Sequence, residues 1–245
     1  MLYLCGVKPE HVTFDFKQFS VTDRGCGMKL GTDGVLLGAW TRMPGESTVR
    51  VCDAGAGCGI VALMLAQRHA ALDITAVDID APSARDAAAN FACSPWSGRL
   101  RAVCADITAG GCGEPFDMIV SNPPFFHTGE RAPGASRAAA RHADSLSADW
   151  LIEHAPGMLA SGGSLTMIVP AADEERLVEC AAFARMYPRR LCRVSSVEGK
   201  APIRLLIELR PADGPVEISE MALRRADGPN SQAYVTLFKD FYLHL

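Results

Sequence analysis

The sequence of 245 residues lacks the features that mark a membrane or secreted protein. No apolar run reaches the ~18–20 residues that a helix needs to span a bilayer. The opening residues, Met-Leu-Tyr-Leu-Cys, have neither the basic segment nor the cleavage site of a signal peptide. We therefore expect a cytoplasmic protein that makes no contact with a membrane.

Patterns that bind metals are missing as well. The nine cysteines form no Cys-x-x-Cys pair, and they do not cluster with histidines at metal-ligand spacings. Their odd number and scattered positions favour reduced thiols in the core and in loops. The sequence predicts no metal site and no disulfide framework, and nothing in it indicates an obligate protein partner.

Charged residues are sparse, at 21% of the chain, whereas 49% of residues are hydrophobic. This composition is typical of one well-packed globular domain. The net charge of −4 argues mildly against nucleic acid, yet residues 185–225 alone carry nine basic and five acidic side chains. Arg131, Arg137 and Arg141 form a second basic cluster. Both clusters fit phosphate binding, and both also fit a solvated helix face.

The first positive signal is the segment 49–59, Val-Arg-Val-Cys-Asp-Ala-Gly-Ala-Gly-Cys-Gly. A β-branched run ends at Asp53, three glycines alternate at Gly55, Gly57 and Gly59, and an apolar run follows. This pattern predicts a strand, a tight turn and the start of a helix. Glycine lets the backbone approach a ligand closely and adopt positive φ. The alternative is an ordinary turn between a strand and a helix.

The glycine spacing narrows the choice of ligand. The dinucleotide fingerprint G-x-G-x-x-G requires a third glycine where this chain has Ile60. An acid at the strand end suits a ligand with an amino group better than it suits a pyrophosphate. The pattern resembles the first motif of the class I S-adenosylmethionine-dependent methyltransferases. In that class the loop holds the methionine part of the cofactor.

A second signal follows the predicted strand 116–120. Asn122-Pro123-Pro124-Phe125 resembles the [Asp/Asn/Ser]-Pro-Pro-aromatic motif of the members of that class that methylate amino groups. Two prolines stiffen the backbone and leave its carbonyls free to accept hydrogen bonds. The Asn122 side-chain oxygen and the Pro123 carbonyl can hold both hydrogens of an exocyclic amine, while Phe125 stacks on the base for roughly 1–3 kcal/mol. A proline-rich turn is the alternative.

Strands and helices alternate from residue 49 onward, which predicts an α/β fold with a parallel sheet and helices on both faces. The expected strands are 49–52, 74–77, 100–104, 116–120, 164–169, 191–197 and 203–209, and the expected helices are 59–69, 82–92, 148–159 and 173–186. The resemblance implies a Rossmann-like sheet of seven mostly parallel strands. We expect residues 1–48 to form an N-terminal extension that closes over the cofactor site, and 49–245 to form the methyltransferase domain.

Three acids, Asp53, Asp78 and Asp106, follow predicted strand ends. In open α/β sheets, ligands bind outside the carboxyl ends of the strands. Asp78 comes 25 residues after Asp53, which is about the interval at which an acid accepts hydrogen bonds from ribose hydroxyls. Asp80 competes for that role. A solvated carboxylate at each strand end is the alternative.

Longer segments extend the likeness. They are Phe16-Lys17-Gln18-Phe19, residues 28–40 with their Lys-x-Gly-Thr-Asp-Gly block, residues 62–68, Ser94-Pro95-Trp96, and the tail from Tyr234 to Leu243. From about residue 14 to its end, the chain resembles the bacterial tRNA1(Val) adenine N6-methyltransferase family. The resemblance implies N6-methylation of the adenine beside the anticodon, with tRNA as the partner and S-adenosylmethionine as the cofactor.

The resemblance also implies roles for individual residues. Lys29, Thr32 and Asp33 lie near the methionine end of the cofactor, Asp78 and Ile79 at its ribose, and Asp106 and Ile107 at its adenine. The implied RNA contacts are Pro124, Phe126, Arg131, Arg137 and Arg141. Relatives often carry tyrosine where this chain has phenylalanine after the two prolines, and the alanine-rich arm 128–143 leaves the RNA contacts there open.

Other functions remain as alternatives. The same Asn-Pro-Pro motif serves enzymes that methylate a glutamine amide in a protein, although these usually carry a sizeable helical domain before the core. Adenine in DNA or rRNA is another substrate that fits. A non-catalytic RNA-binding module is disfavoured by the intact motif, and a nicotinamide-dependent oxidoreductase is disfavoured by Ile60.

Overall fold

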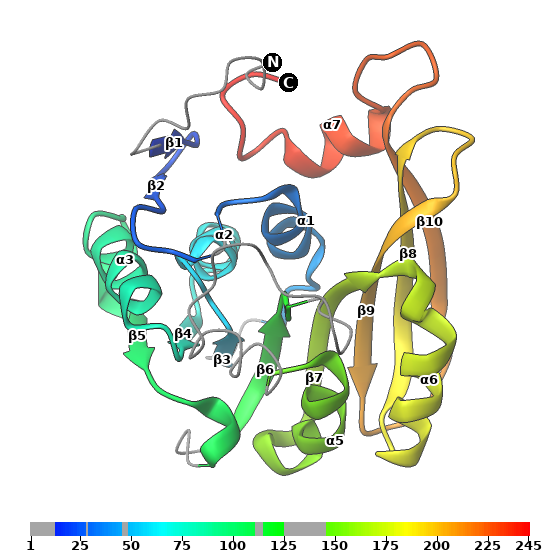
Figure 1. Ribbon diagram of the computed structural model, residues 1–245, viewed down its shortest axis with the longest axis horizontal. Coiled ribbons are helices and arrows are strands. Elements are labelled where there is room, and N and C mark those ends of the chain that lie inside the picture. The colour runs from blue at the N-terminus through cyan, green and yellow to red at the C-terminus, as the bar shows by residue number, and fades with distance from the viewer. Residues whose placement is uncertain (1–12, 28, 46–48, 111–114, 125–145) are drawn as a thin grey trace.

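The computed structural model describes residues 13–27, 29–45, 49–110, 115–124 and 146–245 (Figure 1). Its centre is one sheet of eight strands in the order β10-β8-β9-β7-β6-β3-β4-β5. These strands are β3 (Val49–Ala54), β4 (Leu72–Asp78), β5 (Leu100–Cys104), β6 (Phe116–Ser121), β7 (Leu159–Pro170), β8 (Tyr187–Val197), β9 (Pro202–Arg210) and β10 (Glu217–Arg224). Strands β3 to β7 are mutually parallel, β9 is antiparallel to both of its neighbours, and β10 is parallel to β8.

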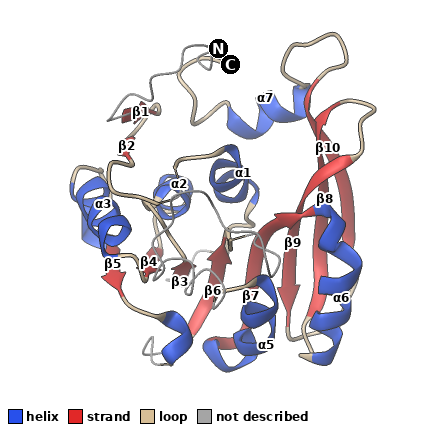
Figure 2. Cartoon of the chain, in the orientation of Figure 1, coloured by secondary structure: helices blue, strands red, loops and turns tan. Residues whose placement is uncertain are grey.

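Helices cover both faces of the sheet (Figures 1 and 2). One face carries α1 (Thr32–Trp40), α2 (Ile60–Arg68), α3 (Ala81–Ala92) and α7 (Gln232–Phe238), and the other carries α5 (Ala148–Met158) and α6 (Glu174–Phe183). Side chains alternate between the two cores, because successive strand residues point to opposite faces. Met118 and Val120 of β6 join the α1–α2 core, and Ile119 between them joins the α5–α6 core.

The predicted α/β class and the predicted alternation of strands and helices are confirmed, but the count of seven strands is wrong. The eighth strand, β10, lies at the sheet edge and pairs only with β8 among the described strands. Its residues are mostly exposed, and Glu217 and Glu220 interrupt the apolar pattern. A strand with one pairing edge and little burial carries too weak a hydrophobic alternation to be recognised from sequence. The Pro156-Gly157 pair predicts a break or kink near the end of the helix 148–159, but α5 continues past Pro156 and ends at Met158.

An N-terminal hairpin packs beside this sheet. Strands β1 (Thr13–Asp15) and β2 (Ser20–Thr22) pair antiparallel and form this hairpin. The Phe16 and Phe19 side chains at its turn are buried in the same core as α1 and α2. Residues 13–41 therefore share the core of the sheet, while the division of the chain at residue 48 stays a prediction.

Candidate functional site

The two sequence signals meet where the strand order of the sheet reverses. Strands β4 and β5 lie on one side of β3, whereas β6 and β7 lie on the other. Ala54 at the end of β3 is paired in register with Ser121 at the end of β6, and the Ser121 hydroxyl donates to the Ala54 carbonyl at 2.7 Å. Since neighbouring strands are about 4.8 Å apart, the glycine loop and the Asn-Pro-Pro loop begin side by side. Open α/β sheets bind ligands at such a reversal.

The three glycines of the loop have different surroundings, although all have positive φ. A Cβ on Gly59 would lie 2.5 Å from the ring of Phe91, and a Cβ on Gly55 would lie 3.0 Å from Leu146. A Cβ on Gly57 would meet nothing within 4 Å in the described part of the chain. Gly59 therefore allows α3 to pack closely against the loop, while Gly57 faces open space among the described residues.

Asp78 holds the loop from the end of β4. One of its carboxylate oxygens accepts a hydrogen bond from the Gly57 amide at 2.7 Å, and the other accepts from the Asp80 amide at 2.8 Å. Burial raises the pKa of the Asp78 carboxyl. Asp80 uses its own carboxylate to cap α3 through Ser83. Of these two acids, Asp78 is the one that lies against the glycine loop.

Asp53 lies beneath the loop rather than at its mouth. Its side chain is 1% exposed, and its carboxylate accepts a hydrogen bond from the Ala62 amide in the first turn of α2 at 3.1 Å. Burial raises the pKa of Asp53 to about 7, and repulsion from the Asp78 carboxylate acts in the same direction. Asp53 thus fixes the start of α2 relative to the loop, while direct contact with a cofactor stays a prediction.

Asp106 and Ile107 follow β5, at the carboxyl ends of the parallel strands, where Asp53 and Asp78 also lie. The Asp106 carboxylate accepts hydrogen bonds from the amide and the hydroxyl of Thr108, and so caps the short 3₁₀ helix Ile107–Ala109. Ile107 is buried. The Ala105 amide donates to the Asp78 carbonyl at 3.0 Å, and this bond joins the ends of β4 and β5. The acids expected at the strand ends therefore share one edge of the sheet, and Ile79 lies beside them after β4.

Asn122 carries an acceptor that has no donor. Its side-chain oxygen Oδ1 is buried and has no hydrogen-bond partner in the described part of the chain. An unpaired buried acceptor typically costs about 1–3 kcal/mol, and so it requires a physical explanation. A bound amino group would satisfy this oxygen. Pro123 is buried and Pro124 is half-buried next to it.

The predicted aromatic and basic contacts to RNA cannot be placed. Phe125, Phe126, Arg131, Arg137 and Arg141 lie outside the described residues. In the other basic region, residues 185–225, many of the arginines form ion pairs with carboxylates. The pairs are Arg190 with Glu208 and Glu217, Arg193 with Glu174 and Glu220, Arg204 with Asp33, Arg210 with Glu208, and Arg225 with Asp227. Much of the positive charge between residues 185 and 225 therefore belongs to ion pairs within the protein.

Two acids that sequence reasoning missed organise the segment before α1. Asp23 is buried and accepts a hydrogen bond from the Leu30 amide at 2.8 Å, and the Lys29 ammonium donates to the Asp23 carbonyl at 2.6 Å. Asp86 of α3 accepts from the Gly25 amide at 2.6 Å and from the Cys26 amide at 3.2 Å. Asp86 binds residues about 60 positions away, so no local spacing could have indicated it.

Helix α1 is held tightly against α2. A Cβ on Gly34 would lie 3.0 Å from Ile60, and a Cβ on Gly38 would lie 2.8 Å from Met64. Arg68, at the end of α2, donates hydrogen bonds of 2.7 Å to the carbonyls of Gly38 and Thr41. These contacts fix the helix whose first turn carries Thr32 and Asp33.

Taken together, the residues at this edge fit a cationic ligand such as S-adenosylmethionine. Asp78 places a carboxylate against the glycine loop, Gly57 faces open space among the described residues, and the Asn122 oxygen has no donor among them. The described residues contain no group of three or more side chains that could hold a metal ion. Nor does the described part include a helix long and apolar enough to cross a membrane.

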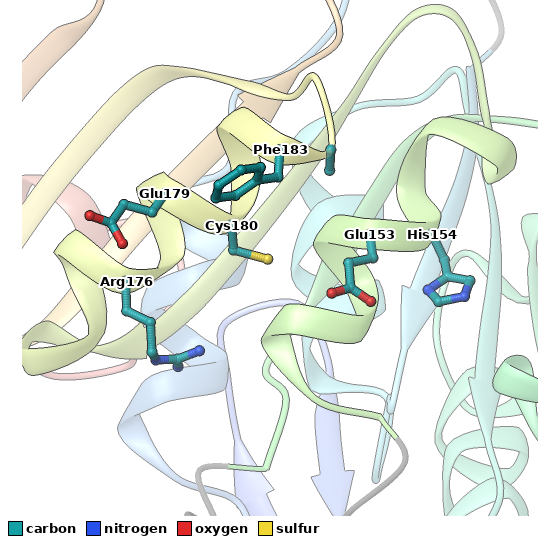
Figure 3. Close-up of a pocket in the computed structure, with 7 residues that line it drawn as sticks. Glu153, His154, Arg176, Glu179, Cys180 and Phe183 are labelled. Atoms are coloured by element: carbon teal, nitrogen blue, oxygen red, sulfur yellow. The ribbon is translucent and has the colours of Figure 1, made fainter.

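A depression elsewhere on the surface takes no part in this site. It lies between α5 and α6 (Figure 3). Its lining residues are Glu153, His154, Arg176, Glu179, Cys180, Phe183 and Ala184. None of them comes from the loops that follow β3 to β6, and Arg176 is already paired with Asp149 and Asp173.

Comparisons with known proteins find relatives that match nearly the whole chain. The methyltransferase small domain family matches residues 35–178. A Tolumonas auensis protein named tRNA1(Val) (adenine(37)-N6)-methyltransferase is 39% identical over 236 residues, which cover 95% of this chain and 98% of that protein. A Bacteroides fragilis protein of the same name is 38% identical over 235 residues, with 95% and 98% of the two chains covered.

Solved structures show a similar fold at low sequence identity. A predicted O-methyltransferase from Agrobacterium tumefaciens has a TM-score of 0.62 at 18% identity, over 85% of this chain and 96% of that one. The tRNA m1G37 methyltransferase of M. jannaschii has a TM-score of 0.60 at 13% identity, over 84% of this chain and 56% of that one. Likeness at this level of identity concerns the fold.

Proposed function

The chain belongs to the tRNA1(Val) (adenine(37)-N6)-methyltransferase family, and from that premise we propose that it methylates N6 of adenine 37 with Asn122 and Pro123 as the groups that hold the amine. The observation that supports this assignment best is the buried Asn122 oxygen beside the glycine loop, which has no hydrogen-bond partner among the described residues. The activity would take place in the cytoplasm, on tRNA.

The cofactor, S-adenosylmethionine, supplies a methyl group on a positively charged sulfur. Gly55, Gly57 and Gly59 would form the floor of its site, and Asp78 would bind its ribose. Asp53 supports that floor from below, through its hydrogen bond to the Ala62 amide. Asp106 and Ile107 would contact the adenine. Lys29, Thr32 and Asp33 would close the methionine end.

Asn122 and Pro123 deal with the weak nucleophilicity of adenine N6, whose lone pair is delocalised into the ring. Two fixed acceptors, the Asn122 side-chain oxygen and the Pro123 carbonyl, take both N–H hydrogens and turn the lone pair out of the ring plane. Fixed orientation of this kind contributes up to roughly 7–11 kcal/mol to a two-reactant step. No strongly basic side chain is required, because the amine loses its proton readily after methylation.

The substrate assignment follows the chemistry of the loop. Phe125, Phe126 and Pro124 would stack on or flank the adenine, and Arg131, Arg137 and Arg141 would bind nearby phosphates of the RNA. An anticodon loop presents its bases unpaired, so extracting the adenine costs at most a few kcal/mol. An alternative protein or DNA substrate would use the same two acceptors, and a substrate assay separates these possibilities.

Two variants that affect different steps test the residue roles: one affects methyl transfer and the other affects cofactor binding. Asn122→Ala should lower transfer to tRNA by at least about 100-fold, as the loss of one oriented transition-state contact does, while leaving cofactor affinity unchanged. Asp78→Ala should instead weaken cofactor binding by about tenfold or more, since a charged hydrogen-bond acceptor is lost. Tritium transfer and calorimetry measure the two quantities. Substantial transfer by Asn122→Ala would refute the assignment.

The tRNA substrate is tested directly by nucleoside mass spectrometry. We expect tRNA from cells that lack this protein to lose one N6-methyladenosine, and the purified protein to restore it. Labelled methyl transferred to bulk protein, DNA or rRNA in place of tRNA would overturn the substrate assignment and leave the acceptor chemistry intact.

A further inference from the structure

An ion pair connects the first turn of α1 to a distant strand. Arg204 Nε of β9 donates to Asp33 Oδ2 at 2.9 Å, and Arg204 Nη1 donates to the carbonyl of Ile203 at 3.0 Å. The two side chains are 29% and 23% exposed, so the pair is largely shielded from water. Hydrogen bonds between oppositely charged groups in such positions orient their partners strongly.

Arg204 lies at the same end of the sheet as the site, where the parallel strands have their carboxyl ends. It is paired in register with Pro170, the last residue of β7. Only β7 separates β9 from β6, the strand that leads into Asn122. Two strand spacings amount to about 10 Å across the sheet. Ser121 of β6 is level with Met167 of β7, so Arg204, level with Pro170, lies three residues further along the strands, beyond the ends of β3 and β6.

The chain is bound both before α1, at Gly25 and Cys26, and in the first turn of α1, at Asp33. At the first place, the Gly25 and Cys26 amides are held by Asp86 of α3, the helix whose Phe91 packs on Gly59. At the second place, Asp33 is held by Arg204. The segment between these two places thus connects the α3 side of the glycine loop with the β9 side of the sheet.

We propose that Arg204 is a positioning residue for methyl transfer, because its bond to Asp33 fixes the Lys29–Asp33 block over the methionine end of the cofactor. This inference rests on the proposed function, which puts that block at the cofactor. In this role Arg204 acts through the Asp33 carboxylate that it holds. Loss of Arg204 lets the Asp33 carboxylate turn away, and cofactor affinity falls while the contacts of the target base remain.

The test is a double-mutant cycle read by calorimetry of cofactor binding without RNA. Arg204→Gln and Asp33→Asn should each raise the Kd for S-adenosylmethionine about tenfold, which corresponds to about 1.4 kcal/mol. The double variant should bind no more weakly than Asp33→Asn alone, since contacting residues that act as one unit are non-additive. Arg204→Lys should recover part of the affinity, because it keeps the charge but not the planar guanidinium.

Arg193→Gln is the matched control. Arg193 of β8 pairs with Glu174 of α6, and the two side chains are 31% and 22% exposed, much like the proposed pair. It should lower the thermal midpoint as much as Arg204→Gln does, yet keep the cofactor Kd within about twofold. The inference is overturned if Arg204→Gln binds cofactor normally, if the effects of the two single variants add, or if only the KM for tRNA changes. Cofactor binding needs no transfer step, so the result is independent of Asn122→Ala.

Discussion

Acids at equivalent strand ends serve different purposes at the scale of single residues. The Asp53 carboxylate is almost fully buried against the first turn of α2, whereas the Asp78 carboxylate binds the Gly57 amide in the loop itself. Asp80 caps α3. The difference arises because each carboxylate binds a different backbone amide. The Ala62 amide lies 9 residues after Asp53, the Gly57 amide lies 21 residues before Asp78, and the Ser83 amide lies 3 residues after Asp80.

The sequence therefore identifies which residues reach the site but not what each of them binds. The glycine loop and the Asn-Pro-Pro loop can be recognised from the sequence, because turn geometry depends on adjacent residues. Asp23, Asp86 and Arg204 leave no local sign, since their partners are fixed by packing between elements. The unpaired Asn122 oxygen is likewise visible only when the surrounding fold is known.

Asp53 makes stability depend on pH. Its folded pKa of about 7 lies above the value near 3.9 of an unfolded aspartate, so the folded state keeps a proton that the unfolded chain has lost. The stabilisation from this proton is fully present below about pH 4 and is lost as the pH rises through about 7. A tenfold difference in proton affinity between the two states corresponds to about 1.4 kcal/mol, and the whole effect is a few kcal/mol at most.

Asp53→Asn removes this titration while keeping an acceptor for the Ala62 amide. We expect urea unfolding of the variant to show a smaller loss of stability between about pH 5 and about pH 8 than the unaltered protein shows. The exposed Asp73→Asn serves as the control and should follow the unaltered protein. The same pH slope in all three proteins would contradict the role of Asp53.

At the scale of elements, close packing of helices on the loop shapes the site. Helix α3 approaches Gly59, and helix α1 approaches α2 through Gly34 and Gly38. Each glycine removes a Cβ that would otherwise meet a neighbouring side chain. The site is therefore built by the way these helices pack as well as by the loop sequence.

Two glycine variants separate packing from ligand binding. Both residues have positive φ, so alanine costs roughly 1–2 kcal/mol at either position. Gly59→Ala adds a Cβ at 2.5 Å from the Phe91 ring and should cost about 1–3 kcal/mol more in overpacking. Gly57→Ala adds no such clash, but its Cβ would enter the open space of the site.

We expect Gly59→Ala to lose stability in urea unfolding without cofactor. Gly57→Ala should stay closer to the unaltered protein in that assay and lose at least about tenfold in cofactor affinity by calorimetry, or about 1.4 kcal/mol. Normal cofactor binding by Gly57→Ala would show that the ligand does not approach this residue.

At the scale of the whole molecule, the alternation of strands and helices was predictable because buried parallel strands are continuous apolar runs. The eighth strand was not, because β10 pairs along one edge and exposes most of its side chains. The contact between the N-terminal hairpin and the C-terminal segment could not be predicted from the sequence either, for another reason. Phe16 forms a bridge with Tyr242, and contacts so distant in sequence leave no periodic signal.

The contact between the hairpin and the C-terminal segment leads to a final prediction, which concerns how the chain unfolds. Phe238 of α7 is fully buried in the α1–α2 core and packs against Tyr234 and Tyr242. Phe238→Ala should lower the free energy of unfolding by about 3–5 kcal/mol, as the loss of a large core side chain does. Phe183→Ala, at a residue that is 91% exposed, should change it by no more than about 0.5 kcal/mol.

Since the hairpin, α1 and α7 share this core with the sheet, both variants and the unaltered protein should unfold in one cooperative transition. In a background that carries Trp96→Phe and Trp150→Phe, tryptophan fluorescence reports on Trp40 of α1. Circular dichroism, followed through the same urea unfolding, reports on the helices and strands of the whole fold. Coincident curves are expected. Two separate transitions would show that the part of the chain before residue 49 folds as a unit apart from the sheet, and that the shared core contributes little to the stability of either.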